Sequence, residues 1–422
     1  MNVRLQAFEI LHTVYKDKGF INILLNNALL EEVYKDVDRG LLTTICYGVL
    51  QNSIYLDYEI KNRCEGKNLD PKMRTLLKVA LYQMNFMDKI PNYAIVNETV
   101  EIAKKVMGKQ ASKFANGVLR NAIRNPFVLN PNDFKDEVAY LCVKYSHPEW
   151  LIRMIGKHYG MENAIKYMKT NYSIPPLSLR VNTLRTTMEE MLSKPYFEKG
   201  TLSPVGLIYK GKEPIAKTKE FLDGFVTIQD ESGQMVAEIM NPKENSKILD
   251  MCAAPGSKTF HIASKINNKG SIVSVDLYEH RIQLLKNQIK RMNATCVIPL
   301  CYDSTKLLDK YKEETFDYVL LDAPCSGYGV VRRKPDLLVN TSQNDLDSII
   351  NIQKELIDVA VKLVKKGGVL VYSTCTLNKK ENENQVKYLI EKYPEFKVLE
   401  QKLIFNFEYN TDGFFICKLE RN

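Results

Sequence analysis

Two cysteines follow directly after hydrophobic segments that are typical of buried strands. Cys325 lies in Ala-Pro-Cys-Ser-Gly after the segment 318–321, and Cys375 lies in Ser-Thr-Cys-Thr after the segment 369–372. Ligands of open α/β sheets bind beyond the carboxyl ends of the strands. We therefore expect both thiols and the carboxylate of Asp322 to lie in one cleft. Two thiols and an acid are suited to attack on an electron-poor ring.

A turn of mostly small residues follows an earlier predicted strand, 247–251. Small residues let a ligand approach the backbone, and the start of the helix predicted after the turn offers free N–H groups. The turn is not a P-loop, because the upstream glycine is missing, and its single glycine also excludes G-x-G-x-x-G. The predicted cofactor-binding turn consists of Cys252, Ala253, Ala254, Pro255, Gly256, Ser257 and Lys258.

Acidic residues end the next two predicted strands. Asp276 lies 20 residues beyond Gly256, where an acid typically accepts hydrogen bonds from ribose hydroxyls. Without a diphosphate-binding loop, such an acid favours S-adenosylmethionine as the cofactor. Asp303 is placed to meet the adenine amino group. A single acid at a strand end is more often a turn or helix cap, but three in succession, with Asp322 as the third, favour a cofactor site.

Three regions with different patterns position these residues. Apolar residues recur at steps of three and four in the first region, which predicts an all-α bundle of six or seven helices over 1–128. Short strands and helices mix over 132–240 and predict a small α+β module. Strands alternate regularly with helices over 241–422, which predicts a doubly wound, Rossmann-like α/β domain with a mainly parallel sheet.

The amino-acid composition limits which classes of partner, compartment and metal site are expected. The chain has 59 Lys and Arg against 50 Asp and Glu, a net charge of +9, which permits a polyanionic partner without demanding one. Its 9 cysteines have no repeated short spacing, which argues for a reducing compartment and against a zinc site. We expect a cytoplasmic protein with no membrane segment and no bound metal. Apart from Cys252 in the turn, the remaining cysteines are expected to be small buried hydrophobic residues.

With these motifs assembled, the chain resembles the RNA 5-cytosine methyltransferases of the Sun/Nol/Nop family over about 140–422. The first region resembles a NusB-like domain in its length and helical pattern. One departure is Ser257, where the family usually has a second glycine; a serine fits a helix start, so cofactor binding is expected to survive. The resemblance rests on the segments 250–259, 322–327 and 373–376, with support from 229–232, 332–336 and 412–415.

The resemblance implies a role for each residue of the cleft. Cys375 is the implied nucleophile that adds to carbon 6 of cytosine, and Cys325 assists later, when the proton leaves carbon 5. Asp322 contacts the cytosine and also lies near the cofactor. A free thiol is only slightly ionised at neutral pH, and Lys258 is the candidate charge that activates Cys375.

The implied substrate is 16S rRNA with an exposed cytosine, and the protein is expected to be a monomer without an obligate protein partner. Two alternatives remain open: a transfer RNA cytosine-5 methyltransferase, and a non-catalytic RNA-binding assembly factor that uses the helical bundle. Several basic residues could extend the RNA contact, and an ordinary solvated surface is the equally favoured alternative. They are Lys109, Lys113, Arg120 and Arg124 on the last helix of the bundle, Arg180 and Arg185, and Arg332, Arg333 and Lys334 after the Cys325 motif.

Overall fold

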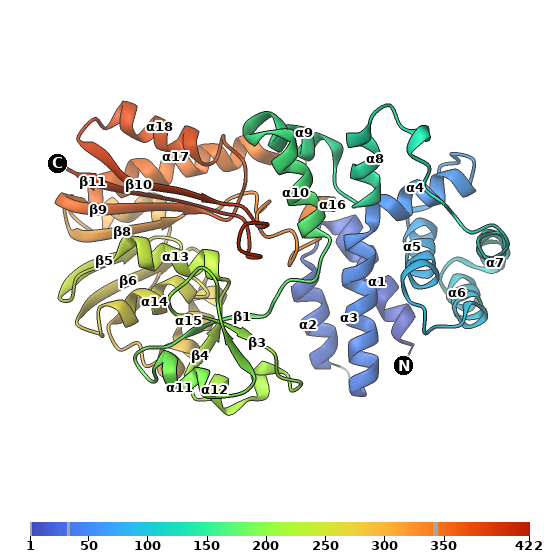
Figure 1. Cartoon of the computed structure of the whole chain (residues 1–422), viewed down its shortest axis with the longest axis horizontal. Helices are drawn as coiled ribbons and strands as arrows, with labels where there is room; N and C mark the ends of the chain where they lie inside the picture. The colour runs from blue at the N-terminus through green and yellow to red at the C-terminus, as the bar shows by residue number, and fades with distance from the viewer. Residues whose placement is uncertain (1, 32–33, 341–344) are drawn as a thin grey trace. The chain divides into compact units, whose positions relative to one another are not determined.

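A computed structural model describes residues 2–31, 34–340 and 345–422. The chain forms two compact units (Figure 1). The first, which we call the helical unit, comprises 1–173 and the short segment 331–341. The second comprises 174–330 and 342–422, and we call it the catalytic unit because it contains the predicted thiols and cofactor turn. The two helices at 149–171, which we predicted to belong to the α+β module, thus lie in the helical unit. A compact unit is not the same as a functional domain, so the division into the domains 1–128, 132–240 and 241–422 stays a prediction.

The helical unit is all-α, as predicted. Several helices begin at the capping residues that the sequence offers: the Asn2 side chain accepts the N–H groups of Arg4 and Leu5, and Asp70 caps a helix that starts with proline. The helices are α1 (Val3–Asp17), α2 (Ile21–Glu31), α3 (Asp36–Gln51), α4 (Ser53–Arg63), α5 (Pro71–Phe86), α6 (Asn92–Met107), α7 (Lys109–Arg124), α8 (Glu137–Lys144), α9 (Glu149–Tyr159), α10 (Met161–Asn171) and α16 (Leu337–Asn340).

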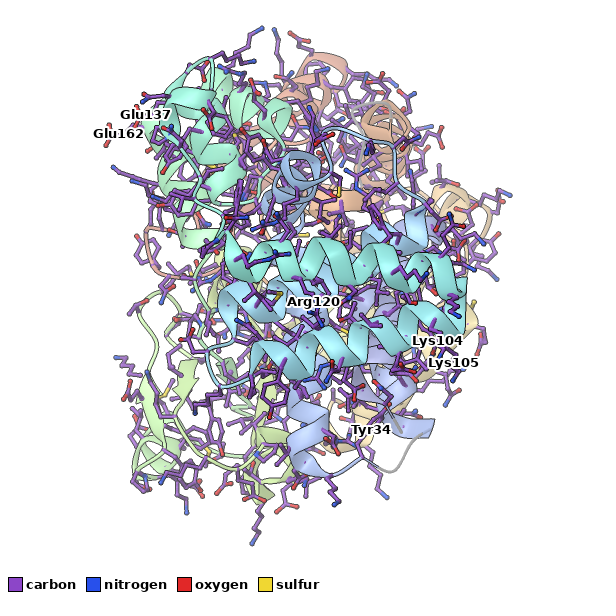
Figure 2. All side chains as sticks on the ribbon, turned by 90° about the vertical axis from the view of Figure 1, so that its right-hand side faces the viewer. Tyr34, Lys104, Lys105, Arg120, Glu137 and Glu162 are labelled. Atoms are coloured by element: carbon purple, nitrogen blue, oxygen red, sulfur yellow. The ribbon has the colours of Figure 1, made fainter. Side chains whose placement is uncertain are left out.

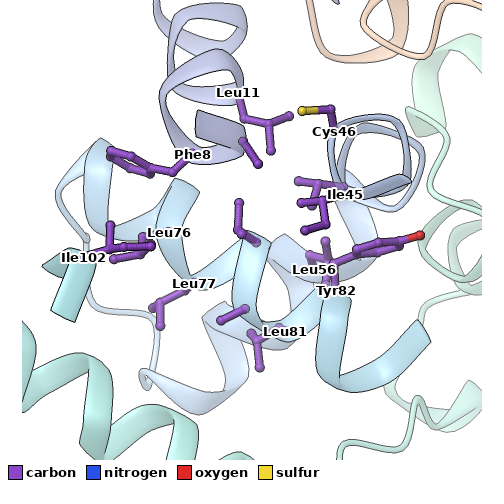
Figure 3. Close-up of a cluster of buried hydrophobic side chains, with 14 of the residues drawn as sticks. Phe8, Leu11, Ile45, Cys46, Leu56, Leu76, Leu77, Leu81, Tyr82 and Ile102 are labelled. Atoms are coloured by element: carbon purple, nitrogen blue, oxygen red, sulfur yellow. The ribbon is translucent and has the colours of Figure 1, made fainter. Parts of the chain in front are cut away.

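One apolar core holds α1 to α7 together. Leu11, Ile45 and Leu77 are completely buried in it, and Figure 3 shows their side chains converging from α1, α3 and α5. Gly48 lets α3 approach α5 closely, since a Cβ there would lie 2.0 Å from the ring of Tyr82. Burial of this apolar surface is the main stabilising term of such a bundle.

The segment 331–341 belongs to the helical unit although it follows the Cys325 motif. Its Arg332 is 7% exposed and donates through Nε to the carbonyl of Ser173. The carboxylate of Asp336 accepts the N–H of Ile21 at the start of α2, and burial raises the pKa of this carboxyl. We had considered Arg332 as a possible phosphate contact, but it is buried, whereas Lys334 is exposed.

The catalytic unit begins with a small antiparallel sheet of order β2-β3-β1-β4. Its strands are β1 (Ser178–Val181), β2 (Phe197–Lys199), β3 (Gly206–Tyr209) and β4 (Val226–Ile228), accompanied by α11 (Met188–Leu192) and α12 (Lys219–Leu222). The buried carboxylate of Glu231 accepts the N–H groups of Thr201, Leu202 and Ser203 and so fixes the turn between β2 and β3. The predicted α+β character is confirmed. Arg180 is completely buried in this sheet, so it is not available to RNA as considered above.

A seven-stranded sheet of order β10-β11-β9-β8-β5-β6-β7 forms the rest of the unit. The five strands from β9 to β7 are parallel, and β11 and β10 add to the other edge in antiparallel pairing. The strands are β5 (Ser246–Asp250), β6 (Gly270–Asp276), β7 (Val297–Cys301), β8 (Phe316–Asp322), β9 (Val364–Thr374), β10 (Phe396–Ile404) and β11 (Phe414–Arg421).

Helices cover both faces of this sheet (Figure 1). Side chains that alternate along each strand form two apolar layers: Leu249 and Val319 pack with α17 and α18, and Ile248 and Leu320 pack with α13 and α14. The predicted doubly wound architecture is confirmed. The helices are α13 (Glu231–Met240), α14 (Ser257–Lys265), α15 (Glu279–Met292), α17 (Asp345–Leu363) and α18 (Glu383–Lys392).

Two details differ from the sequence prediction. The segment 369–372 was predicted as a strand; β9 is longer, begins at Val364 and passes through Gly367 and Gly368, with a break in its register against β8. Strands β10 and β11 were not predicted. Within the described ranges, no helix is long and apolar enough to cross a membrane.

Candidate active site

The order of the strands reverses between β5 and β8. From β5 the chain continues to β6 and β7 on one side, and β8 and β9 extend the sheet on the other. A crevice forms beyond the carboxyl ends of the strands at such a reversal. Asp250 ends β5 and Asp322 ends β8, so both carboxylates lie at this position.

The structure brings the two predicted thiols together. Ser373 is paired with Asp322 on β9 and β8, and the N–H of Ala323 donates to the carbonyl of Ser373. The loops that leave both strands therefore start side by side, and the Sγ atoms of Cys325 and Cys375 lie 3.3 Å apart. Both residues are partly exposed.

Gly329 holds the Cys375 loop from the other side. Its N–H donates to the carbonyl of Cys375 at 2.9 Å, and its own carbonyl accepts the N–H of Gly413 at 2.8 Å. A Cβ at Gly329 would lie 1.9 Å from the carbonyl oxygen of Gly413. Only glycine permits this close approach of three backbone segments.

Asp322 links the end of β9 to a cation. Its Oδ2 accepts a hydrogen bond of 2.7 Å from the Lys258 ammonium, and its Oδ1 accepts one of 2.8 Å from the Ser373 hydroxyl. Burial alone would lower the pKa of Lys258, but the charge of Asp322 and the hydrogen bond to it outweigh burial, and the pKa is raised. The charge of Cys375 acts in the same direction. Lys258 is therefore a persistent cation in the electrostatic range of that thiol.

The Cys325 thiol resists ionisation. The contact with Cys375 raises the pKa of Cys325 well above the ordinary value, and burial and the charges of Glu381 and Asp322 add to this effect. Cys325 is thus held as a neutral thiol whose proton can be shared with the neighbouring sulfur.

The predicted cofactor turn lines a small cavity. Gly256 has a φ of 106° and Ser257 is the first residue of α14, as expected for a serine at a helix start. The described residues around this cavity of about 60 Å³ are Asp250, Cys252, Ala253, Ala254, Pro255, Ser257, Lys258 and Asp322.

The Asp250 carboxylate in the wall of this cavity suits a donor group of S-adenosylmethionine. Its Oδ2 accepts the Thr259 hydroxyl at 2.6 Å, whereas its buried Oδ1 has no hydrogen-bond partner among the described residues. Burial raises the pKa of Asp250 to about 7. A donor or positive group of a ligand would satisfy this oxygen, and S-adenosylmethionine carries hydroxyl, ammonium and sulfonium groups.

Asp276 and Asp303 do not line the 60 Å³ cavity. Asp276 is 4% exposed, and its Oδ2 lies 3.2 Å from Arg281, which also donates to the carbonyl of Ala254 in the turn. Asp303 caps a short helical turn by accepting the N–H and hydroxyl of Thr305, the role we considered for a single strand-end acid. Their contacts with ribose and adenine stay predictions.

Sequence reasoning missed two buried carboxylates. Asp250 begins the motif that carries the cofactor turn but was not assigned to the site. Glu381 follows Cys375 by 6 residues, and only the folded chain brings it to the Cys325 loop. The expectation for the other cysteines holds for Cys46, Cys64, Cys142, Cys296 and Cys417, but Cys301 is exposed at the end of β7, where the sheet edge leaves it uncovered.

Three sequence families match successive parts of the chain. The profile of the family described as 16S rRNA methyltransferase RsmB/F matches residues 237–420, and the NusB family profile matches residues 1–124. A third profile, described as the RsmF/B-like ferredoxin-like domain, matches residues 147–194.

Two curated relatives match this chain over nearly their full length. A Bacillus subtilis protein described as probable ribosomal RNA small subunit methyltransferase B is 37% identical, covering 100% of this chain and 99% of the relative. The ribosomal RNA small subunit methyltransferase B of Vibrio cholerae is 32% identical over 100% of this chain and 98% of its own length.

Among solved structures, NSun6 from Pyrococcus horikoshii with SFG matches with a TM-score of 0.59 at 25% identity, over 65% of this chain and 98% of that one. The structure described as PH0851 matches with a TM-score of 0.85 at 26% identity, over 100% of this chain and 99% of that one. The order of the matched regions, the relatives of full length and the crevice with its cofactor turn lead to one conclusion: the chain belongs to the RsmB/F family of S-adenosylmethionine-dependent 16S rRNA methyltransferases.

Proposed function

We propose that this methyltransferase forms 5-methylcytosine in 16S rRNA through a covalent bond between the sulfur of Cys375 and carbon 6 of the cytosine. The observation that carries the proposal is the pair of sulfurs 3.3 Å apart, at the strand ends next to the cofactor turn. Family membership favours ribosomal RNA over transfer RNA and an enzyme over a non-catalytic assembly factor.

Carbon 5 of cytosine is a poor nucleophile. When the Cys375 thiolate adds to carbon 6, the electron pair of the carbon 5–carbon 6 double bond moves towards carbon 5 and ring nitrogen 3, and carbon 5 becomes nucleophilic. S-adenosylmethionine supplies an electrophilic methyl group to this carbon. Removal of the proton from carbon 5 then restores the double bond and expels the Cys375 thiolate.

Cys325 serves as the proton carrier in this scheme. Before the reaction it holds a proton, because the neighbouring sulfur raises its pKa. Once Cys375 is bound to carbon 6, that sulfur no longer carries a negative charge and the pKa of Cys325 falls. The same thiol can then release its proton to solvent, and the resulting thiolate takes the proton from carbon 5.

Lys258 and Asp322 prepare the crevice for this chemistry. The Lys258 ammonium favours the thiolate of Cys375, as an opposite charge does. Asp322 is held by two hydrogen bonds of 2.7 and 2.8 Å, and we assign it to the exocyclic amine of the cytosine and to the cofactor. Asp276 and Asp303 are assigned to the ribose and the adenine, and the turn from Cys252 to Lys258 to the rest of the cofactor.

We assign RNA binding to the first domain, 1–128, and to the module 132–240, and catalysis to 241–422. All four basic residues predicted on α7 are exposed, and Figure 2 shows Arg120 of α7 with Lys104 and Lys105 of the adjoining α6. Phosphate contacts of such a surface would position the RNA without reading its sequence. We propose that the enzyme acts as a monomer in the cytoplasm.

The experiment is a comparison of two variants with 16S rRNA and labelled cofactor. We expect Cys375→Ala to lose methylation completely while it still binds S-adenosylmethionine in a calorimeter. We expect Cys325→Ala to accumulate a protein–RNA adduct that survives a denaturing gel, because the proton on carbon 5 cannot leave. Bisulfite sequencing then locates the modified cytosine. Normal turnover by Cys375→Ala would refute the proposal.

A further inference from the structure

Glu381 is a buried acid that the proposed chemistry does not use. Its side chain is 0% exposed, and no cation pairs with it among the residues that the structure describes. A carboxylate in such a place needs several donors to remain there.

Four hydrogen bonds surround the carboxylate. Oε1 accepts from the Ser326 hydroxyl at 2.6 Å and from the Asn378 amide at 2.9 Å. Oε2 accepts from the Ser326 N–H at 2.8 Å and from the Gln353 amide at 3.3 Å. All four partners donate, so both oxygens must accept.

These bonds connect the two loops that carry the thiols. Ser326 follows Cys325 directly, and its hydroxyl also lies 2.7 Å from the hydroxyl of Thr376, which follows Cys375 directly. The backbone of Glu381 is tied to β9, because its carbonyl accepts the Tyr372 hydroxyl at 2.6 Å. One carboxylate thus joins the residue after each sulfur.

We propose that Glu381 is a positioning residue of the methyl transfer: its carboxylate holds the Ser326 loop against the Thr376 loop and thereby sets the distance and the proton order of the Cys325 and Cys375 sulfurs. This inference rests on the proposed roles of the two thiols. Glu381 contacts neither sulfur within hydrogen-bond distance in any described contact, so it acts through Ser326.

The charge of Glu381 adds a second effect. It contributes to the raised pKa of Cys325, together with Cys375, burial and Asp322. Described charged groups that act on the two thiols include Lys258, Asp322 and Glu381, of which Lys258 is the cation. The raised pKa of Cys325 keeps the proton on that sulfur.

The test measures the reactivity of each sulfur without RNA or cofactor. Full-length parent protein and variants are treated with iodoacetamide at neutral pH, and the alkylation rates of Cys375 and Cys325 are read from their peptides by mass spectrometry. Only thiolates react, so the ratio of the two rates reports which sulfur holds the proton.

In Glu381→Gln the amide nitrogen would face donors, and the charge is lost. We expect the Cys375 to Cys325 rate ratio to fall at least fivefold, and turnover on 16S rRNA to fall at least tenfold with KM within twofold. Ser326→Ala keeps the charge and removes only the hydroxyl, so we expect a smaller fall in the ratio. Glu391→Gln, an exposed substitution on α18, should leave both quantities unchanged.

A rate ratio within twofold of the parent in both Glu381→Gln and Ser326→Ala would overturn the proposal. If Glu381→Gln does not fold, Ser326→Ala alone decides. The double variant should lose no more turnover than Glu381→Gln, because both changes break the same link. Since alkylation requires no substrate, its outcome is independent of Cys375→Ala: retained turnover in that variant would refute the covalent mechanism without deciding how the sulfurs are held.

Discussion

The core of the helical unit and the crevice of the catalytic unit are built from different side chains. The core of the helical unit is a single cluster of apolar side chains from α1 to α7, whereas the crevice of the catalytic unit buries Ser326, Ser373, Thr376 and Glu381 beside the thiols. Apolar contacts are non-directional and tolerate exchange of similar residues. A buried polar network works only when every donor has its acceptor. Substitutions in the helical core should therefore lower the free energy of unfolding, whereas substitutions in the crevice should lower the rate of methyl transfer.

The largest effect is expected at Lys258. In Lys258→Met, Asp322 loses its ammonium partner and Cys375 loses the nearby positive charge. Each charge-assisted interaction contributes about 1.5–3 kcal/mol, so turnover should fall at least a hundredfold. Single-turnover methylation of 16S rRNA measures this loss, and Trp150, the only tryptophan of the chain and located on α9, should report unchanged urea unfolding of the helical unit.

Lys265→Met is the matched control, because Lys265 is another cation of α14 whose ion pair, with Glu238 at 2.9 Å, lies outside the thiol crevice. It should retain turnover within a few fold. If both variants slow the reaction equally, α14 acts through its general stability and the assignment of Lys258 is wrong.

The same difference between apolar packing and polar contacts explains which parts of the fold could be predicted from the sequence. Helical periodicity and strand–helix alternation identified the all-α region, the α+β module and the doubly wound sheet, because one-dimensional apolar patterns encode which side of an element is buried. Strand β10 was not predicted because only two of its nine residues are buried and four are polar, as is typical of an edge strand. The 331–341 segment joined the helical unit through contacts such as Asp336 with Ile21, which no local pattern carries.

The site was predictable only in part. The thiols and Asp322 could be grouped, because strand ends in a parallel sheet share one edge. The ion pair of Lys258 with Asp322, the unpaired oxygen of Asp250 and the four bonds of Glu381 depend on side-chain directions across neighbouring strands and loops. A sequence states which residues are present but not which donor meets which acceptor.

The apolar side of the comparison can be tested at Leu77, which is 0% exposed in the core shown in Figure 3. Leu77→Ala leaves a cavity among packed helices, and such truncations cost about 2–5 kcal/mol. Urea unfolding followed by Trp150 fluorescence should show this loss, while calorimetric affinity for S-adenosylmethionine stays within twofold. Leu30→Ala on α2, where the leucine is 83% exposed, should change stability by less than about 0.5 kcal/mol. Equal effects of both variants would contradict the single-core description.

The smallest effect concerns a buried polar side chain of the helical unit. His147 is 2% exposed; its Nδ1 lies 2.7 Å from the carbonyl of Tyr145 and its Nε2 lies 3.2 Å from the Asn171 amide. Burial lowers the pKa of His147 to about 4, although the contact with the Tyr145 carbonyl acts in the opposite direction. The folded state therefore favours the neutral ring, whereas the unfolded chain takes up a proton near pH 6.5.

The stabilisation from the neutral ring is complete above pH 6.5 and is lost as the pH falls towards 4. Linkage gives a loss of about 2 kcal/mol at pH 5. Trp150 lies three residues from His147, so urea unfolding by fluorescence at pH 7 and pH 5 follows the relevant unit. In the parent, the free energy of unfolding drops between pH 7 and pH 5, and in His147→Gln this drop should be smaller by about 2 kcal/mol. His280→Gln, on the exposed surface of α15 in the catalytic unit, should show the same drop as the parent. An unaltered drop in His147→Gln would mean that this ring is already protonated in the folded helical unit, and that the apolar interior there accommodates charge as the catalytic crevice does.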